Sequence, residues 1–248
     1  MLTADDVRRW VGLEGVPSAL VAARDAVDVL LRDRGLRRTT PELTAESLLR
    51  GAAASARLEG SASTLDDLRG GDGDPLALAT ARMNAALLAL VPVVQRAPVQ
   101  AIARLHTLAA AGLVDDGELG RPRPVDGAAA RLHALSAVLL ASTDVPAIAM
   151  AGIAHAELMT AAPFAMANGV VARGLERLLL VARGVDPTSM VVPEAGHLAL
   201  EPVYRAALTA YAEGGEAGRR AWLLHVVQAT ATGVEASPLR SGTPRDTP

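Results

Sequence analysis

The sequence contains no cysteine among its 248 residues. A chain without cysteine forms no disulfide, and it has no thiol nucleophile and no thiolate ligand for a metal ion. Its first ten residues, MLTADDVRRW, are polar and charged and lack the apolar run of a secretory signal. Both features favour a cytoplasmic protein.

Aromatic residues are also scarce. The chain has only 2 Trp, 2 Tyr and 1 Phe, although half of its residues are hydrophobic. A chain of this length and composition can bury a substantial core. Because that core must be built mainly from Ala, Leu and Val, the composition favours closely packed helices.

Lysine is absent, so all 24 basic residues are arginine, and the formal net charge is -3. Nucleic-acid-binding domains normally carry a clustered basic surface, which this charge balance does not indicate. The apolar stretch Val145–Val171 has the length of a membrane span, but four polar or helix-breaking residues interrupt it: His155, Glu157, Pro163 and Asn168. We therefore expect neither a nucleic-acid partner nor a membrane partner.

Apolar residues recur at three- and four-residue spacing along most of the chain, and no segment has a sustained period-two run of β-branched residues. This pattern predicts an all-α fold of amphipathic or buried helices. The predicted helices cover Ala19–Leu31, Leu43–Leu58, Leu76–Val94, Val99–Leu113, Ala128–Leu140, Val145–Met159, Val170–Arg183, Leu198–Tyr211 and Arg219–Val234.

Two polar stretches suggest how the chain is divided. Ser61–Asp74, which includes Gly-Gly-Asp-Gly at 70–73, is predicted to link an N-terminal helical region, residues 1–70, to a main body, residues 71–236. The final segment, Ser237–Pro248, has three prolines and almost no apolar side chain. It cannot offset the entropy of ordering, so residues 237–248 are predicted to form a disordered tail.

The segment Ala162–Arg173 reads A-P-F-A-M-A-N-G-V-V-A-R. It resembles the signature of the Fic (Fido) family, H-P-F-x-D/E-G-N-G-R-x-x-R, whose members typically transfer AMP from ATP to a protein hydroxyl. The two agree at five positions: Pro163, Phe164, Asn168, Gly169 and Arg173. The resemblance implies a Fic-like helical bundle with a short β-hairpin flap ahead of the signature.

Residues 115–127 read DDGELGRPRPVDG, and their glycines and prolines exclude a continuous helix. The resemblance places the family's flap, which holds a target protein by strand pairing, at about this position. An ordinary surface loop is the alternative. Under the first interpretation, the flap at residues 115–127 is the contact for a protein partner.

Four positions depart from the family signature. The catalytic His is replaced by Ala162, the Mg-binding acid by Met166, the first Gly by Ala167 and the first Arg by Val170. Alanine cannot accept a proton, a thioether is a poor ligand for Mg²⁺, and valine has no donor for a phosphate. The sequence therefore predicts no catalytic residue at the family's His position and no metal site.

The backbone part of the signature remains. Ala167, Asn168 and Gly169 stand at the predicted start of a helix, where free N–H groups and the helix dipole favour an anion. Arg173, one turn further on, would reach the same anion. These four are the predicted nucleotide- or phosphate-binding residues, for ATP or another nucleotide without Mg²⁺. The alternative is a simple N-cap turn followed by a solvated arginine.

A second resemblance lies about a hundred residues upstream, where residues 55–60 read S-A-R-L-E-G. This is similar to the family's inhibitory motif, S/T-x-x-x-E-G/N, whose Glu pairs with the second signature Arg in self-inhibited members. The resemblance implies an inhibitory group of Ser55, Glu59 and Gly60, and an ion pair between Glu59 and Arg173. For Glu59 alone, a surface carboxylate at a helix end is the alternative.

The histidines are interpreted as structural. His155 lies seven residues before Ala162, a spacing that the family often has. His155-Ala156-Glu157 also imitates the H-x-E of zinc deaminases, but this chain lacks the cysteines of those sites, so we exclude zinc. The remaining histidines are predicted to pack, and the acidic residues near 115 to form a solvated turn: His106, His133, His197, His225, Asp115, Asp116 and Glu118.

Together these observations predict a degenerate Fic-domain protein. Its function would be that of a pseudoenzyme that binds a nucleotide, a phosphate or a protein partner instead of transferring AMP. One alternative is an adenylyltransferase-like enzyme that still transfers AMP or another phosphate-containing group without the His. Another is an unrelated all-α protein whose matching residues coincide by chance. The first two require Asn168 to begin a helix and Glu59 to approach Arg173.

Overall fold

The computed structural model describes residues 1–34, 39–124, 127–141 and 144–241, and the regular structure in these residues is helical. An isolated bridge between Ala111 and Val114 is the one strand-like pairing among them. The predicted all-α fold is therefore confirmed.

The helices follow the chain in this order: α1 (Ala4–Val11), α2 (Val16–Arg34), α3 (Pro41–Leu58), α4 (Leu65–Gly70), α5 (Pro75–Ala86), α6 (Val91–Val94), α7 (Pro98–Ala110), α8 (Ala128–Ala141), α9 (Ala147–Ala161), α10 (Asn168–Ala182), α11 (Pro193–Ala199), α12 (Glu201–Glu213), α13 (Gly215–Glu235) and α14 (Pro238–Ser241). Two short 3₁₀ helices, η1 (Leu87–Leu90) and η2 (Asp116–Glu118), complete the described elements.

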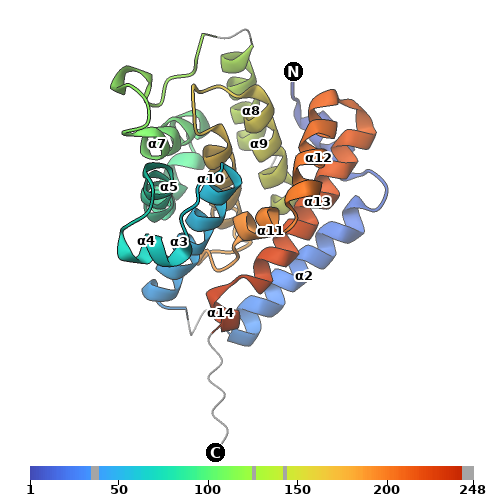
Figure 1. The fold of residues 1–248 in the computed structure, drawn as a ribbon. Coiled ribbons are helices and arrows are strands. Elements are labelled where there is room, and N and C mark those ends of the chain that lie inside the picture. Colours follow the sequence, from blue (N-terminus) through green and yellow to red (C-terminus); the bar gives the residue numbers. More distant parts are fainter. Residues whose placement is uncertain (35–38, 125–126, 142–143, 242–248) are drawn as a thin grey trace, which may run out of the picture.

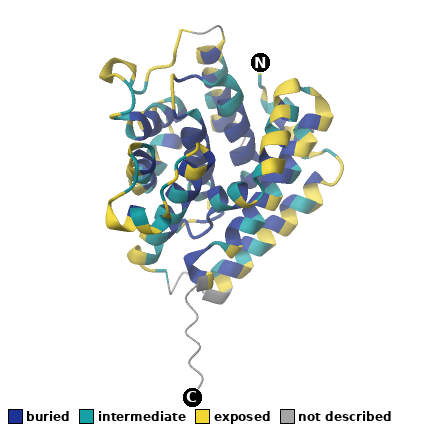
Figure 2. Cartoon of the chain, viewed as in Figure 1, coloured by how far each residue is buried: buried dark blue, intermediate teal, exposed yellow. Residues whose placement is uncertain are grey.

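Helices α9 and α10 pack along each other at the centre of the molecule (Figure 1). Every residue from Ile148 to Leu158 in α9, and from Gly169 to Leu180 in α10, is buried. Figure 2 shows this buried centre between two exposed flanks. Helices α2, α12 and α13 cover one side, and α3, α5 and α7 cover the other. The signature segment, which joins α9 to α10, is thus anchored at both ends in the core.

Small residues allow the central helices to approach closely, as the scarcity of aromatic residues predicts. A Cβ atom at Gly152 of α9 would lie 2.6 Å from Cγ2 of Val226 in α13. A Cβ at Gly196 of α11 would overlap the backbone carbonyl of Ala229, also in α13. Glycine is needed at both positions because any larger residue would push the helices apart.

Two helices predicted as continuous are divided at prolines. The stretch predicted over residues 76–94 consists of α5, η1 and α6, and Pro92 lies in the first turn of α6. The stretch predicted over residues 198–211 crosses from α11 into α12, where Pro202 lies in the first turn. Proline has no N–H to donate and its ring clashes with the carbonyl four residues earlier, so each proline starts a new helix.

The segment predicted as a polar linker, Ser61–Asp74, contains helix α4, so that prediction was wrong in part. Thr64 and Asp67 form a capping box at the start of α4. Asp74 accepts hydrogen bonds from the hydroxyls of Ser61 (2.5 Å) and Ser63 (3.0 Å). The polar side chains of Ser61–Asp74 therefore bond to one another and to the backbone of this segment, so the segment is folded and is not an open linker.

The prediction of a disordered tail from residue 237 was wrong for its first five residues. Residues 238–241 form α14, and the side chains of Ser237 and Leu239 are buried. A single apolar residue in the right register was enough to dock this turn on the core. Residues 242–248 lie outside the described part of the chain.

Buried contacts cross the predicted boundary at residue 70. One cluster of buried apolar side chains contains Val7 and Leu58 from the predicted N-terminal region together with residues of the main body as far as Val234, and it also includes Leu239 of the predicted tail. A smaller cluster joins Ala52 of α3 to Ala77 of α5. The division into two regions stays a prediction, but the two regions share one core.

Among the described residues, the stretch Pro75–Val94 is long and apolar enough to cross a membrane by length and composition. It comprises α5, η1 and α6 in succession, and its helices pack against α3, α7 and α10. Packing of this kind is typical of a core helix.

A cluster of polar side chains lies inside the core where α9, α10, α11 and α13 meet. The carboxylate Oε2 of Glu176 is hydrogen-bonded to Nδ1 of His155 (2.5 Å) and to Nε2 of His197 (2.9 Å). Nδ1 of His197 is 2.9 Å from Nε2 of His225. Burial lowers the pKa of His155 to about 4 and that of His225 to about 3. Although burial works against the Glu176 carboxylate, His197 and His155 hold its pKa well below the ordinary value.

These shifts predict a loss of stability in weak acid. His155 and His225 titrate near 6.5 when unfolded but lower when folded, so the unfolded chain binds more protons below pH 6.5. The free energy of unfolding should therefore fall as the pH drops from 6.5 towards 4. The expected loss is about 1–2 kcal/mol per histidine between pH 6.5 and 5. Urea denaturation at half-unit pH intervals measures it, and a flat profile across this window would contradict the shifts.

Candidate functional site

The signature segment keeps a defined loop. Helix α9 ends at Ala162 in the left-handed conformation, with φ 41°. The Asn168 side chain then clamps the backbone of Phe164: its Oδ1 accepts from the Phe164 N–H, and its Nδ2 donates to the Phe164 carbonyl, both at 2.9 Å. The Phe164 ring is buried and stacks on His106 at 3.9 Å. Pro163, Phe164 and Asn168 therefore hold the turn.

Helix α10 begins at Asn168, as predicted. The residue before it, Ala167, has φ 60° and makes no side-chain capping bond. Glycine would adopt this left-handed conformation freely, whereas alanine costs about 1–2 kcal/mol. Ala167 thus adopts a conformation that favours glycine, at some cost in strain.

Arg173 is buried and held on several sides. Its Nε donates to the hydroxyl of Ser55 (2.9 Å), and its Nη2 donates to the Ser55 carbonyl (3.1 Å) and to Oε1 of Glu59 (2.7 Å). Its Nη1 donates to the hydroxyl of Tyr204 (3.2 Å). The predicted approach of Glu59 to Arg173 is confirmed. Although burial opposes the charge, Tyr204 and Glu59 raise the pKa of Arg173 above its ordinary value.

The Glu59 carboxylate lies over the N-terminus of α10. Glu59 is the C-cap residue of α3, and a Cβ atom added at Gly169 would overlap its Oε1. The same added Cβ would lie 3.2 Å from Nη1 of Arg173. The positive end of a helix and a nearby guanidinium form an anion site. In this structure the protein's own carboxylate occupies it.

Helix α3 is anchored to α10 one turn further along. The guanidinium of Arg177 donates to the carbonyl and hydroxyl of Ser47 in α3, to the hydroxyl and carbonyl of Ser189, and to Glu194 of α11 at 3.0 Å. Arg177 and Glu194 are both buried. A Cβ at Gly51 would overlap Arg177, so glycine lets α3 pass over it. This contact sets where the end of α3, and hence Glu59, can lie.

A pocket of about 500 Å³ opens in front of Glu59. The polar side chains among its lining residues are two carboxylates and one hydroxyl, and its walls are otherwise largely apolar. The lining residues are Glu59, Gly60, Ser61, Asp74, Pro75, Leu76, Leu113, Met166 and Ala167. Donation from the Ser61 hydroxyl lowers the pKa of Asp74, so that carboxylate stays charged. A phosphate would meet two negative charges here unless Glu59 turned away.

Three of the four departures from the signature replace a reactive side chain, and the structure places each of the three residues. Ala162 presents a methyl group where the family has its base, and Met166 is half exposed at the pocket. Val170 is buried in the apolar core. His106 lies beneath Phe164, where burial lowers its pKa, and its Nδ1 accepts the Gly120 N–H at 2.9 Å. It therefore acts as packing and not as a substitute base.

The predicted hairpin at residues 115–127 is absent from the described residues of this segment, and residues 125–126 lie outside them. Its ordered part is η2 followed by a turn. Arg123 ties this loop to the signature: its backbone N–H donates to the Pro163 carbonyl (2.7 Å) and its Nη2 to the Ala162 carbonyl (2.8 Å). The surface-loop alternative describes the segment, since its prolines and glycines interrupt any ladder of hydrogen bonds.

Tyr204 and Arg177 were not predicted as part of the site, and Arg123 was predicted only as part of the flap at residues 115–127. Tyr204 reaches the site from α12, whereas Arg177 lies one turn beyond Arg173 on α10. His155, His197 and His225 are buried and hydrogen-bonded, and Asp115, Asp116 and Glu118 are exposed, as predicted. The prediction that His133 packs was wrong, because its side chain is exposed on α8 and bonds to the Ala129 carbonyl of its own helix.

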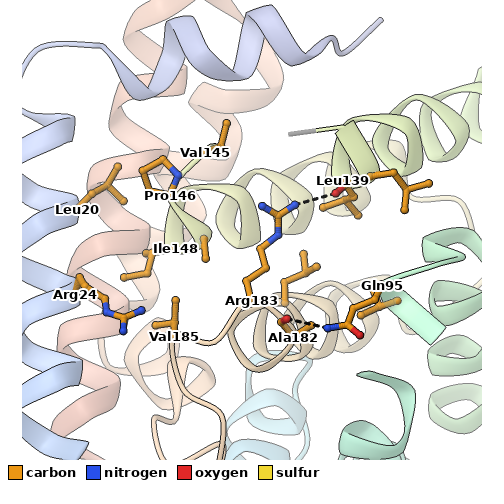
Figure 3. Close-up of a pocket in the computed structure, with 14 residues that line it drawn as sticks. Leu20, Arg24, Gln95, Leu139, Val145, Pro146, Ile148, Ala182, Arg183 and Val185 are labelled. Carbon is orange, nitrogen blue, oxygen red and sulfur yellow. Dashed lines mark hydrogen bonds between the residues drawn. The ribbon is translucent and has the colours of Figure 1, made fainter. Parts of the chain in front are cut away.

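A second pocket, of about 600 Å³, lies at the far end of α10 (Figure 3). The polar groups drawn there already bond to the chain: Arg183 donates to the Leu139 carbonyl (2.8 Å) and Gln95 to the Ala182 carbonyl (3.1 Å). None of the predicted site residues lines it. The site therefore stays at the N-terminal end of α10.

No protein-family model and no curated protein matches the sequence. Solved structures do match in fold. A Fic family protein from Desulfovibrio desulfuricans G20 aligns with a TM-score of 0.73 at 20% identity, over 92% of this chain and 76% of the other. Fic-1 from C. elegans aligns with a TM-score of 0.68 at 20% identity, over 89% of this chain and 71% of the other. The chain therefore has an all-α, Fic-like fold, and the alternative of an unrelated fold is wrong.

Proposed function

We propose that this chain is a degenerate Fic-domain protein that does not carry out ordinary AMP transfer. Its signature helix would bind the phosphate of a nucleotide only when Glu59 leaves, so the protein would work as a nucleotide-responsive or partner-binding module. The observation that carries this proposal is the Glu59 carboxylate over Gly169, bonded to Arg173.

The loss of chemistry is selective. The proton acceptor, the metal ligand and one phosphate cation are replaced by Ala162, Met166 and Val170. The groups that shape the anion site remain: the Asn168 clamp, Gly169 and Arg173. Transfer of AMP needs the first set, whereas holding an anion needs only the second. ATP or another nucleotide without Mg²⁺ is the ligand that this remainder fits.

Glu59 and the nucleotide would compete for one place. An ion-paired hydrogen bond of this kind contributes about 1–3 kcal/mol. A ligand that binds only after Glu59 has moved would then have an apparent affinity about 5- to 150-fold below its intrinsic value. The Glu59 side chain is 31% exposed, so it can turn into solvent without first disrupting the core.

The loop at residues 115–127 is the proposed partner contact. Most of its described side chains are exposed, and Arg123 links it directly to the carbonyls of Ala162 and Pro163. A protein that binds this loop would therefore pull on the turn that precedes α10. Such a contact couples partner binding to the anion site without a strand-pairing flap.

Residual transfer of AMP, or of another phosphate-containing group, to a protein hydroxyl is the second candidate. Arg173 and the turn before α10 are kept, and binding and positioning alone accelerate a reaction after its base is lost. The substrate or water would have to take the proton. The buried state of Arg173 beneath Glu59 disfavours this activity in the resting protein.

The first prediction from this proposal concerns Glu59→Ala. The variant should bind Mg-free ATP about 5- to 150-fold more tightly than the wild type, because no carboxylate has to leave first. Isothermal titration calorimetry in EDTA measures both affinities. Glu213→Ala, which removes an equal charge from the exposed end of α12, is the control and should match the wild type. If neither protein binds ATP at millimolar concentration, the nucleotide-responsive function is abandoned.

A second prediction separates the pseudoenzyme from the enzyme. Incubation with ATP labelled on the α-phosphate and a cell lysate should give no labelled protein that depends on Arg173. Arg173→Ala, checked for folding by near-ultraviolet circular dichroism, is compared with Arg104→Ala, which removes an exposed arginine of α7. Label that appears with the wild type and Arg104→Ala but disappears with Arg173→Ala would establish residual transfer instead.

A further inference from the structure

The hydroxyl of Tyr204 connects the anion site to the polar cluster in the core. It lies 3.2 Å from Nη1 of Arg173 and 2.9 Å from Nε2 of His155. From His155 the contacts continue to Glu176 and then to His197. A line of hydrogen bonds therefore runs from Glu59 at the surface, through Arg173, to a carboxylate in the middle of the protein.

The direction of these bonds follows from the chemistry of the two ends. A guanidinium only donates, so the Tyr204 oxygen accepts from Arg173 and its own proton is left for Nε2 of His155. A neutral His155 then carries its proton on Nδ1, which donates to Glu176. An ionised carboxylate only accepts, so the Nε2–H of His197 also donates to it. Along the line from Arg173 to Glu176, each N–H or O–H group therefore has one acceptor.

A metal ion fits this cluster less well, although His155, Glu176 and His197 bring their ligand atoms within 4.8 Å of one another. Two of the contacts are 2.5 and 2.9 Å, whereas tetrahedral ligands about 2.0–2.1 Å from zinc lie about 3.3 Å apart. Ligation through Nδ1 would also move the His155 proton to Nε2. Tyr204 would then face two donors, and its own proton would have no acceptor in the network.

The ring of Tyr204 is fixed independently of its hydroxyl. It is buried and packs against Trp222 at 6.0 Å, His225 at 5.6 Å and His197 at 4.8 Å between ring centroids. Removing the oxygen alone therefore leaves the packing in place. The hydroxyl is also kept protonated, since burial raises the pKa of Tyr204.

We propose that Tyr204 is a positioning residue for Arg173. The core cluster orients the Tyr204 hydroxyl, and the hydroxyl holds the guanidinium so that its remaining face points at the N-terminus of α10. Arg173 then presents the same geometry whether its acceptor there is Glu59 or an anion. The part of this inference that concerns an anion rests on the proposed function, whereas the part that concerns the guanidinium does not.

The chain offers a matched control on the same helix. Tyr211 of α12 is also buried, and its hydroxyl donates to Oε1 of Glu157 at 2.8 Å, away from Arg173. Tyr204→Phe and Tyr211→Phe each remove one buried hydroxyl and keep one packed ring. An effect on Arg173 that appears only in the first variant belongs to the proposed contact and not to a general loss of stability.

The readout is ¹⁵N nuclear magnetic resonance of the Arg173 and His155 side chains. In Tyr204→Phe we expect the Nη1 protons of Arg173, which lose their acceptor, to exchange with water at least about tenfold faster, corresponding to the loss of about 1.4 kcal/mol of hydrogen bonding. The Nε2 signal of His155 should move towards that of an unbonded acceptor. Tyr211→Phe should leave both unchanged.

Three results would overturn the proposal. The first is an Arg173 exchange rate in folded Tyr204→Phe equal to that of the wild type. The second is a wild-type His155 that carries its proton on Nε2. The third is a rise in melting temperature when stoichiometric Zn²⁺ is added to wild type but not to His155→Ala, because a metal would then organise the cluster.

An affinity measurement separates this inference from the proposed function. With Glu59→Ala as the background, Tyr204→Phe should weaken Mg-free ATP about tenfold and Tyr211→Phe should not. Failure of ATP to bind any variant would reject the proposed function, while the Arg173 exchange rate would still decide whether Tyr204 positions the guanidinium. Equal ATP affinities in Glu59→Ala and in the two double variants, together with an unchanged rate of Arg173 proton exchange, would reject the positioning role.

Discussion

The carboxylate of Glu59 at the N-terminus of α10 is the contact on which the arrangement of the site depends. The first N–H groups of α10 and the buried Arg173 both place positive charge at this point, and a buried cation without a partner is costly. This positive charge needs a nearby anion. The chain supplies one from its own C-cap residue of α3. A form of the protein in which no anion lies beside Arg173 and the N-terminus of α10 would therefore be higher in free energy.

The positions that agree with the signature and those that depart from it differ in what each contributes. Ala162, Met166 and Val170 lack the side-chain chemistry of the signature, and of these Met166 is half exposed and Val170 is buried in the core. Gly169 cannot be replaced in the same way, because a Cβ would overlap Glu59. Asn168 is held by two bonds to Phe164. The residues that agree with the signature are thus the ones that shape the turn and the start of α10, whereas the positions that differ from it are those of its reactive side chains.

Periodicity and the resemblance predicted different parts of this structure. Three- and four-residue spacing was sufficient for the long helices, because each buries one continuous apolar face. It failed for α1, α4, α11 and α14, which have eight residues or fewer; two of them, α1 and α4, begin at capping boxes such as Thr64 with Asp67. The pairing of Glu59 with Arg173 was predictable only through the family motifs. The bond from Tyr204 to Arg173 joins residues 31 positions apart and leaves no periodic trace.

Two buried arginines limit how the site can open. Arg173 and Arg177 lie one turn apart on α10, and they bind Ser55 and Ser47, two turns apart on α3. The bonds of Arg177 to Ser47 and of Arg173 to Ser55 are buried, so a swing of α3 would break both pairs of charged hydrogen bonds at once. Glu59 stands beyond the last turn of α3 and makes one such bond. The Glu59 side chain can therefore leave Arg173 by rotating while α3 stays in place, because that movement breaks one hydrogen bond and leaves the buried contacts of α3 intact.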